Sequence, residues 1–339
     1  MKTVNIWLDN PLNDATTFYV DLLEQSVLKA GLRAVRVTTL QAVLEAEWVI
    51  TLHAKATWMV LRRNKHAKVI TWFQGIVPEE AMLWQGKRLP NRVYKLAWEF
   101  FERIALKRSR FCLFVSEAMH AHYRSKYGVE PAGYEVIPCF NKPLSPSTFA
   151  YPGKYAHPSF VYAGGLDRWQ CIEQMLALFR KIQDRLPTAS LTILSSQQEL
   201  AAKMLDEFGI RNGKVSYVAL AELDQELQKY KYGFLLRADH PINNVATPTK
   251  MNTYLACGII PVYTSAIRDF EVRLGHLPYS IKADHPEDEK VIERVMENEG
   301  QDIDAAALLA PYRAVFASYY STEKYVSDLA AKMAQFAQG

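Results

Sequence analysis

The sequence of 339 residues has few cysteines, and none of them forms a CxxC pair or a histidine-cysteine cluster with the spacing of a zinc site. The four cysteines are Cys112, Cys139, Cys171 and Cys257, three of them within apolar runs. Scattered, apolar cysteines are typical of reduced core residues. We therefore expect a cytosolic protein.

Three further absences narrow the class of protein. No run of about 18 apolar residues occurs, which excludes a membrane-spanning helix. The opening MKTVNIWLDNPL has no long apolar core, so we expect no signal peptide. Neither GxGxxG nor GxxxxGK[ST] is present, which disfavours a standard dinucleotide or P-loop site.

The composition is that of a globular protein, with 49% apolar and 22% charged residues. The length is too great for one ordinary core and suits two domains of roughly 150 residues each. A net charge of +4 supplies little counterion release, and we find no nucleic-acid-binding module, so we expect no nucleic-acid partner.

Apolar runs typical of buried strands alternate with helical periodicity along most of the chain. In the first half these runs are 4–8, 34–39, 48–53, 68–74, 111–116 and 134–139, and in the second half 159–165, 190–195, 215–219, 232–237 and 259–264. The alternation predicts an α/β fold, with parallel sheets covered by helices on both faces.

The segment 141–157 is rich in proline and has little periodicity, which is typical of an interdomain linker. We therefore predict a Rossmann-like N-terminal domain at 1–145, joined by a C-terminal helix at 318–339. A second Rossmann-like domain is predicted at 155–317.

The stretch from Tyr232 to Thr264 is the most informative for function. A buried strand ends at Arg237, a polar loop follows, and a helix begins near Thr249. Ligands bind beyond the carboxyl ends of parallel strands, where helix N-termini stabilise phosphate. Thr247, Thr249 and Lys250 are placed to add hydroxyl and ammonium contacts. The alternative is a capped helix with a solvated lysine.

A family resemblance supports the first interpretation. Pro248 to Gly258, followed by Pro261-Val262, resembles the pattern P-x-K-x-x-E-Y-L-A-x-G of retaining GT-B glycosyltransferases. This large bacterial group (glycosyltransferase group 1-like) builds lipopolysaccharide and capsule. The resemblance implies two Rossmann-like domains with parallel sheets facing across a cleft, and sugar transfer with retention of anomeric configuration.

The chain departs from this family at two positions. Many members carry two glutamates eight residues apart, the second of which binds the ribose, and here these positions are Val245 and Thr253. Either Thr253 and Asn252 hold the ribose instead, or donor use is altered or lost.

A second segment, Tyr162 to Gln170, resembles the glycine turn after the first strand of the family's donor domain. Glycines let a ligand approach the backbone, and a guanidinium suits the paired oxygens of a diphosphate. The resemblance implies Arg168 and Lys250 as catalytic residues. The implied donor contacts are Gly164, Gly165, Asp239, Asn243, Asn244, Thr247, Pro248, Thr249, Asn252 and Thr253.

In the N-terminal half, the stretch from Thr71 to Glu80 resembles the loop in which the family often has a histidine-glycine pair facing the sugar. Gln74 stands in the histidine's place and Gly75 follows it. Glu79 and Glu80 could hydrogen-bond an acceptor or cap the next helix.

Two more positions of this half could face the acceptor or the sugar. Ser116 matches a serine after a strand in the family, and its alternative role is a helix N-cap. Asn13 lies in the loop 10–14, which replaces a glycine-rich loop often found there.

The segment 84–110 combines basic and aromatic residues. Eight lysines and arginines lie there with only two glutamates: Lys87, Arg88, Arg92, Lys95, Arg103, Lys107, Arg108 and Arg110. Aromatic residues beside them (Trp84, Tyr94, Trp98, Phe100, Phe101) suit an anionic membrane surface that carries a lipid-linked acceptor. The alternative is an ordinary solvated helix with its aromatics in the core.

These observations predict transfer of a sugar from a nucleotide diphosphate sugar to a hydroxyl of a glycan or lipid-linked acceptor in cell-surface polysaccharide synthesis. Arg168 and Lys250 would offset the charge on the leaving diphosphate. We expect no cofactor and no metal requirement, and a cytoplasmic location that could include the inner membrane surface. A noncatalytic relative, a nucleotide-sugar epimerase and an inverting transferase stay open as alternatives.

Overall fold

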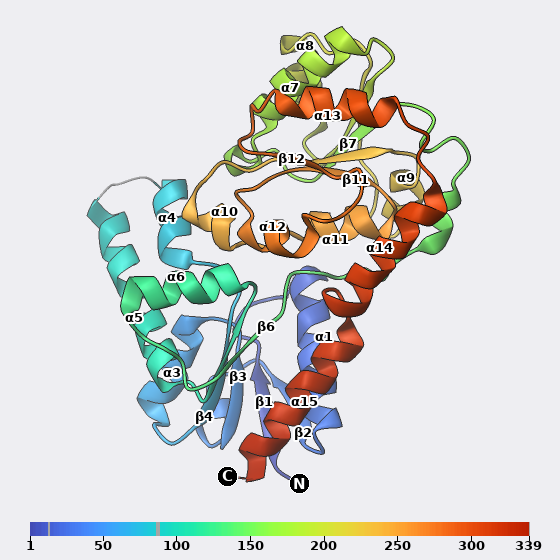
Figure 1. Ribbon diagram of the computed structural model, residues 1–339. Coiled ribbons are helices and arrows are strands. Elements are labelled where there is room, and N and C mark those ends of the chain that lie inside the picture. The colour runs from blue at the N-terminus through green and yellow to red at the C-terminus, as the bar shows by residue number, and fades with distance from the viewer. Residues whose placement is uncertain (13, 86–88, 339) are drawn as a thin grey trace. The chain divides into compact units, whose positions relative to one another are not determined.

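The computed structural model describes residues 1–12, 14–85 and 89–338 (Figure 1). The chain divides into two compact units. Unit 1 consists of Met1–Cys139 and Ser321–Gly339, and unit 2 of Phe140–Tyr320. Each unit contains one parallel β-sheet with helices on both faces.

The sheet of unit 1 has six strands in the order β2-β1-β3-β4-β5-β6. They are β1 (Thr3–Trp7), β2 (Arg33–Val37), β3 (Trp48–Thr51), β4 (Lys68–Phe73), β5 (Phe111–Phe114) and β6 (Tyr134–Val136). Every residue of β3 and β5 is buried. Such continuous apolar runs are expected where helices cover both faces of a parallel sheet.

Seven helices cover this sheet among the described residues of unit 1. They are α1 (Asp14–Lys29), α2 (Gln41–Leu44), α3 (Ala54–Arg63), α4 (Val77–Gln85), α5 (Leu89–Arg108), α6 (Glu117–Tyr127) and α15 (Thr322–Gln338). The last helix, α15, packs along α1 (Figure 1), and Lys29 Nζ donates to Ser327 Oγ at 2.7 Å between them. The basic segment predicted at 84–110 includes the end of α4 and the whole of α5.

The sheet of unit 2 has the order β12-β11-β10-β7-β8-β9. Its strands are β7 (Ser159–Ala163), β8 (Ser190–Leu194), β9 (Gly213–Ser216), β10 (Tyr232–Leu235), β11 (Ile260–Thr264) and β12 (Ile281–Ala283). The order reverses beside β7, which is the topological switch point where doubly wound sheets bind ligands. Strand β12 is an addition to the strands predicted from the sequence, because it is short and the exposed Lys282 interrupts its buried residues.

Helices lie on both faces of this second sheet (Figure 1). They are η1 (Pro146–Ala150), η2 (Arg168–Gln170), α7 (Ile172–Arg185), α8 (Gln198–Glu207), α9 (Leu223–Leu227), α10 (Pro241–Val245), α11 (Thr249–Ala256), α12 (Arg268–Leu274), α13 (Lys290–Glu299) and α14 (Ala305–Ser318). No helix among the described residues is long and apolar enough to cross a membrane.

The entry of the chain into unit 2 is fixed by one buried amide. Asn252, on α11, is 0% exposed. Its Oδ1 accepts hydrogen bonds from the backbone N–H groups of Asn141 (3.1 Å) and Lys142 (3.0 Å), and its Nδ2 donates to the Lys142 carbonyl at 3.1 Å. The amide thus satisfies three backbone groups of an irregular segment, which otherwise lacks a sheet partner.

We expect Asn252→Ala to lower the free energy of unfolding by about 2 kcal/mol, because it leaves partly buried backbone groups without partners. A loss of this size corresponds to a decrease in Tm of about 4–8 °C, which calorimetry would measure. Asn212→Ala is the matched control, since the exposed Asn212 amide also bonds two carbonyls, those of Pro187 and Ala189. An equal decrease in Tm for both variants would contradict a special role for Asn252.

Candidate functional site

Unit 2 contains a cavity of about 380 Å³ at the carboxyl ends of β7 and β8. Its wall includes Gly164, Ser195, Thr249, Lys250 and Thr253. Two lysines, Lys142 and Lys250, line it, and no Asp or Glu belongs to the described part of its wall. Lys142 forms an ion pair with Asp224. Lys250 forms no salt bridge with any described residue, so no ion pair offsets its charge.

Hydroxyl and amide oxygens, rather than a carboxylate, hold the Lys250 amine. Its Nζ donates to Tyr162 Oη at 2.7 Å and to Gln170 Oε1 at 2.8 Å, and it lies 4.0 Å from the centre of the Tyr162 ring. Burial, and then the positive charge of Arg237, lower the pKa of Lys250 well below its ordinary value, while Asp167 opposes this effect. An anion in the cavity would favour the protonated amine.

The glycine turn after β7 makes room for this lysine. Gly164 has φ +139°, and a Cβ at this position would lie 2.5 Å from Lys250 Cε. The turn is fixed by Tyr254, whose hydroxyl accepts a hydrogen bond from Ala163 N at 3.1 Å. A glycine is therefore required here both by the backbone conformation and by the close approach of Lys250.

Arg237, which the sequence analysis did not assign to the site, supplies the second cation. It lies two residues after the end of β10, is 4% exposed, does not line the cavity, and forms no salt bridge within the described part of the chain. Its guanidinium donates to the Leu236 carbonyl at 2.9 Å, and burial lowers its pKa. The available sequence signal was a charged residue at the end of a fully apolar strand.

Arg168, the arginine predicted from the resemblance, lies in the short helix that follows the glycine turn. It belongs to η2, is exposed, and does not line the cavity. The positive charge that acts on Lys250 comes from Arg237. The role of Arg168 stays a prediction.

The other predicted donor contacts fall into three groups. Thr249, Thr253, Gly164 and Gly165 line the cavity beside Lys250, whereas the Asn252 amide is used by the segment at 141–142. The remaining predicted residues are not part of the cavity wall: Asp239, Asn243, Asn244, Thr247 and Pro248.

Hydrogen bonds from two asparagine side chains hold the loop that carries these last five residues. Asn244 Nδ2 donates to Asp239 Oδ1 at 2.7 Å and to the Ala266 carbonyl at 3.0 Å, and Asn243 Nδ2 donates to the Ala238 carbonyl at 2.9 Å. Thr247 is buried, and Pro248 occupies the N-cap position of α11. Part of the predicted polar loop forms the short helix α10.

Unit 1 contains its own cavity, of about 330 Å³, at the carboxyl ends of β1, β3 and β4. Three residues predicted to face the acceptor or the sugar line it: Gln74, Gly75 and Glu80. Gln74 Nε2 donates to the Leu52 carbonyl at 3.1 Å. Asp9, His53 and Trp98 also line the cavity, although the sequence analysis did not assign them there.

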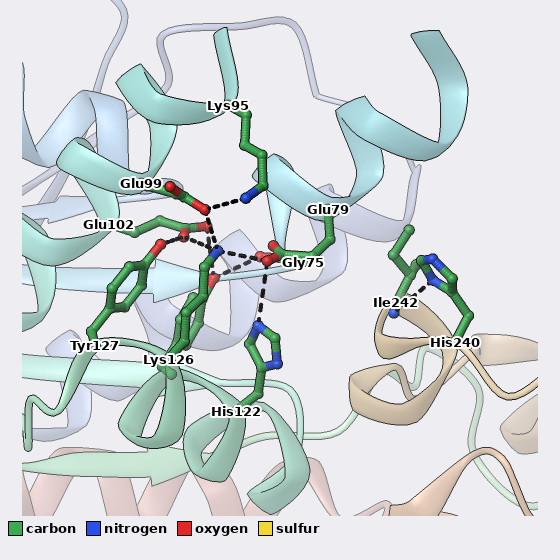
Figure 2. Close-up of polar contacts among 11 residues, drawn as sticks. Gly75, Glu79, Lys95, Glu99, Glu102, His122, Lys126, Tyr127, His240 and Ile242 are labelled. Atoms are coloured by element: carbon green, nitrogen blue, oxygen red, sulfur yellow. Dashed lines mark hydrogen bonds and ion pairs between the residues drawn. The ribbon is translucent and has the colours of Figure 1, made fainter. Parts of the chain in front are cut away.

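Glu79 does not line this cavity and lies in a cluster of charged and phenolic side chains (Figure 2). Its carboxylate accepts a hydrogen bond from Lys126 Nζ at 2.6 Å and lies 3.8 Å from His122 Nε2. Burial alone would raise its pKa, but the nearby His122 imidazole and the hydrogen bond from Lys126 lower the pKa of Glu79 to about 2. Glu79 is therefore a carboxylate of an ion-pair cluster, and its contact with an acceptor stays a prediction.

Glu102 is the buried member of the same cluster (Figure 2). Its two oxygens accept hydrogen bonds from Tyr127 Oη at 2.5 Å and Tyr123 Oη at 3.1 Å. Burial raises the pKa of Glu102 to about 7, against the opposing effects of Tyr127 and Lys126.

Two further predicted residues of unit 1 can be placed or set aside. Ser116 is fully buried and caps α6, because its Oγ accepts from Met119 N at 2.9 Å, which confirms the capping alternative. Asn13 lies outside the described residues.

In the ranges 1–12, 14–85 and 89–338, no group of three or more His, Cys, Asp or Glu side chains is arranged to hold a metal ion. Independence from metal stays a prediction.

The raised pKa of Glu102 predicts a pH-dependent stability. Between its ordinary value near 4.5 and about 7, the folded protein holds a proton on Glu102 that the unfolded chain has lost. The contribution of Glu102 to the free energy of unfolding therefore decreases as the pH rises from about 4.5 to about 7. We expect Glu102→Gln to flatten this dependence in denaturant titrations at several pH values. Glu45→Gln, which removes an exposed carboxylate, should not flatten it; identical pH profiles for the two variants would contradict the assignment.

The sequence matches no family model and no curated protein. Solved structures, in contrast, share its fold over the whole chain. Sucrose-phosphate synthase from Thermosynechococcus elongatus aligns with a TM-score of 0.70 at 14% identity, covering 100% of this chain and 98% of that chain. Anabaena HepE in complex with UDP-glucose aligns with a TM-score of 0.69 at 11% identity, covering 99% of this chain and 100% of that chain.

A third similar structure is longer than this chain. TarM from S. aureus, in complex with fondaparinux, α-GlcNAc-glycerol and UDP, aligns with a TM-score of 0.61 at 12% identity. The alignment covers 83% of this chain and 55% of that chain, so the chain spans about half the length of TarM. The predicted α/β fold with two Rossmann-like units is confirmed, and it is the fold of GT-B glycosyltransferases.

Proposed function

We propose that this chain transfers a sugar from a nucleotide diphosphate sugar to a hydroxyl of a glycan or lipid-linked acceptor, with retention of anomeric configuration. The observation that carries the proposal is the positive charge at the unit 2 cavity, from Lys250 on its wall and from Arg237 behind the described wall. Lys250 lines this cavity, Arg237 acts on it electrostatically, and neither forms a salt bridge among the described residues. A wall with an unpaired lysine and no described carboxylate, backed by a second buried cation, is suited to a negatively charged diphosphate.

The backbone around these cations is also suited to phosphate. The glycine turn at Gly164 and Gly165 opens the wall, and Thr249 and Lys250 form the first turn of α11, whose free N–H groups favour an anion. HepE and TarM, which share the fold, were crystallised with UDP-glucose and UDP. A nucleotide sugar is therefore the ligand class that fits both the cavity and the fold.

The chemistry asked of these residues is stabilisation of a leaving group. When the bond between the anomeric carbon and the phosphate oxygen breaks, negative charge accumulates on the diphosphate. The Lys250 ammonium would offset that charge without a change in its own position, since Tyr162 and Gln170 already hold the amine. Thr253, at the cavity wall, supplies a hydroxyl for the ribose in place of the glutamate that many family members have.

One observation favours a second candidate, a noncatalytic relative that binds a nucleotide. No carboxylate belongs to the described lining of the unit 2 cavity, and Val245 is buried. Nucleotide binding without turnover over a panel of donors and acceptors would support this candidate.

The donor site predicts a nucleotide-dependent increase in stability. We expect one of UDP, GDP, ADP, CMP and dTDP to raise the Tm, because a ligand at one hundred times its Kd stabilises the folded state by about 2.7 kcal/mol. Lys250→Met should abolish the increase by removing the cation while keeping an unbranched side chain. The measurement is a thermal-shift series over the five nucleotides.

Controls separate the individual cations. Lys203→Met removes a lysine from the exposed face of α8 and should leave the shift unchanged. Arg237→Lys and Arg168→Ala, measured side by side, show which arginine contributes. If no nucleotide shifts the Tm, or if Lys250→Met keeps the full shift, the donor site is wrongly placed.

We also propose that unit 1 binds an anionic membrane surface through α5. Four apolar side chains with helical spacing are exposed on this helix: Leu89 (74%), Val93 (61%), Leu96 (64%) and Phe100 (53%). The exposed bases Arg92, Arg103 and Lys107 belong to the same helix. An exposed apolar stripe with neighbouring cations is the pattern of helices that lie at an anionic lipid interface, where a lipid-linked acceptor would be found.

Substitutions on the stripe should weaken membrane binding. We expect Leu96→Glu with Phe100→Glu to reduce sedimentation with phosphatidylglycerol-containing vesicles at least tenfold, because both apolar side chains lose their burial in lipid. Leu200→Glu, on the exposed part of α8, is the control and should sediment like the unmodified chain. Equal sedimentation with neutral vesicles would contradict the role of the bases.

A further inference from the structure

The cavities of the two units carry opposite charge. The described wall of the unit 2 cavity has two lysines and no carboxylate, whereas that of the unit 1 cavity has two carboxylates, Asp9 and Glu80, and no lysine or arginine. A cavity with this second lining attracts hydrogen-bond donors and cations and repels anions. This cavity is therefore unsuited to phosphate and suited to a ligand that offers hydrogen-bond donors or positive charge.

Asp9 is held in place as a charged acceptor by His53. His53 Nε2 lies 2.7 Å from Asp9 Oδ2, and His53 Nδ1 accepts a hydrogen bond from Ala56 N at 3.1 Å as the N-cap of α3. Because Nδ1 accepts, the ring proton is on Nε2 and is donated to Asp9, which leaves the ring neutral and the carboxylate charged. His53 is thus a positioning residue, and the second oxygen of Asp9 is left for a ligand.

Glu80 is the other carboxylate, and the backbone is shaped around it. A Cβ at Gly75 would collide with Glu80 Oε1, so only a glycine at this position allows the carboxylate to lie there. The carboxylate accepts a hydrogen bond from the Ile76 backbone, and no described lysine, arginine or histidine forms an ion pair with it. Burial, and then the charge of Glu79, raise the pKa of Glu80.

An aromatic wall completes the cavity. The partly buried Trp98 of α5 lines it, with its ring centre 5.8 Å from that of His53. Carboxylate acceptors beside an indole face suit a sugar ring, whose hydroxyls donate hydrogen bonds while its C–H face packs on the aromatic ring. A negatively charged group on that sugar would be repelled by the carboxylates of Asp9 and Glu80, which lowers the affinity for such a sugar.

We propose that the unit 1 cavity binds the terminal sugar of the acceptor as a neutral or amine-bearing residue and selects against uronate and phosphorylated sugars. Asp9 and Glu80 accept hydrogen bonds from its hydroxyl or ammonium groups, and Trp98 packs on its ring. This inference rests on the proposed glycosyl transfer, and it adds the chemical class of the acceptor sugar.

The test compares three sugars that differ in charge but share a ring: methyl glucoside, methyl glucosaminide and methyl glucuronide. Saturation-transfer NMR on the full chain gives a Kd for each. We expect the glucoside and the glucosaminide to bind at least tenfold more tightly than the glucuronide. Glu80→Gln, which keeps the shape of the side chain and removes its charge, should reduce this ratio at least threefold. Glu45→Gln removes an exposed carboxylate of unit 1 and should leave the ratio unchanged.

Three results would overturn the inference: binding of the glucuronide at least as tight as that of the glucoside, a ratio that Glu80→Gln does not change, or binding of none of the three sugars. Trp98→Phe provides a second variant, expected to weaken all three sugars alike. The nucleotide shift is measured on the same samples. If the nucleotide shift persists while the sugars fail, only the inference falls; if the nucleotide shift is missing, the proposed function falls.

Discussion

The Lys250 side chain is partly buried, the positive charge of the buried Arg237 acts on its amine, and no described carboxylate forms a salt bridge with it. Separating a cation from water in this way costs free energy unless an anion or several hydrogen bonds replace the water. Here the replacement consists of one phenol and one amide, from Tyr162 and Gln170. The requirements for the rest of the site follow: a glycine at 164 to make room, and Tyr254 to fix the turn.

Sheet topology determines where such an arrangement is possible. In unit 2 the strand order reverses beside β7, and in unit 1 it reverses between β1 and β3. Both cavities lie at the carboxyl ends of these strands. At a reversal the connecting helices leave on opposite faces of the sheet, so the loops separate and leave space for a ligand. The same backbone rule therefore produced two cavities, and the side chains gave them opposite charge.

Features that depend on local pattern could be predicted from the sequence. Buried parallel strands appear as apolar runs, and the glycine turn and the helix at Thr249 follow from local preferences and from one family motif. Lys250 was predicted at the site for this reason, and Gln74, Gly75 and Glu80 were predicted on the unit 1 loop. Strand β12 was missed, since it is short and the exposed Lys282 interrupts its buried residues.

Residues that reach a cavity only through tertiary packing could not be predicted. Trp98 joins the unit 1 cavity because α5 packs against α3, and His53 serves at once as a helix cap and as the partner of Asp9. In unit 2, the glycine turn drew attention to Arg168, the nearest arginine in the sequence. The arginine that acts on Lys250 is Arg237, about 70 residues later, because β7 and β10 are neighbouring strands.

The exchange of a glutamate for Thr253 changes the balance of forces on a donor. A glutamate at this part of the wall would accept hydrogen bonds from the ribose and would also offset part of the charge of Lys250 and Arg237. With Thr253 in its place, a bound ribose would lack a charged acceptor, while a diphosphate would lie beside Lys250, whose charge no described carboxylate of the wall neutralises. A nucleotide bound here would therefore depend more on its phosphates and less on its ribose, and its affinity would fall more steeply with salt than in a site that keeps the glutamate.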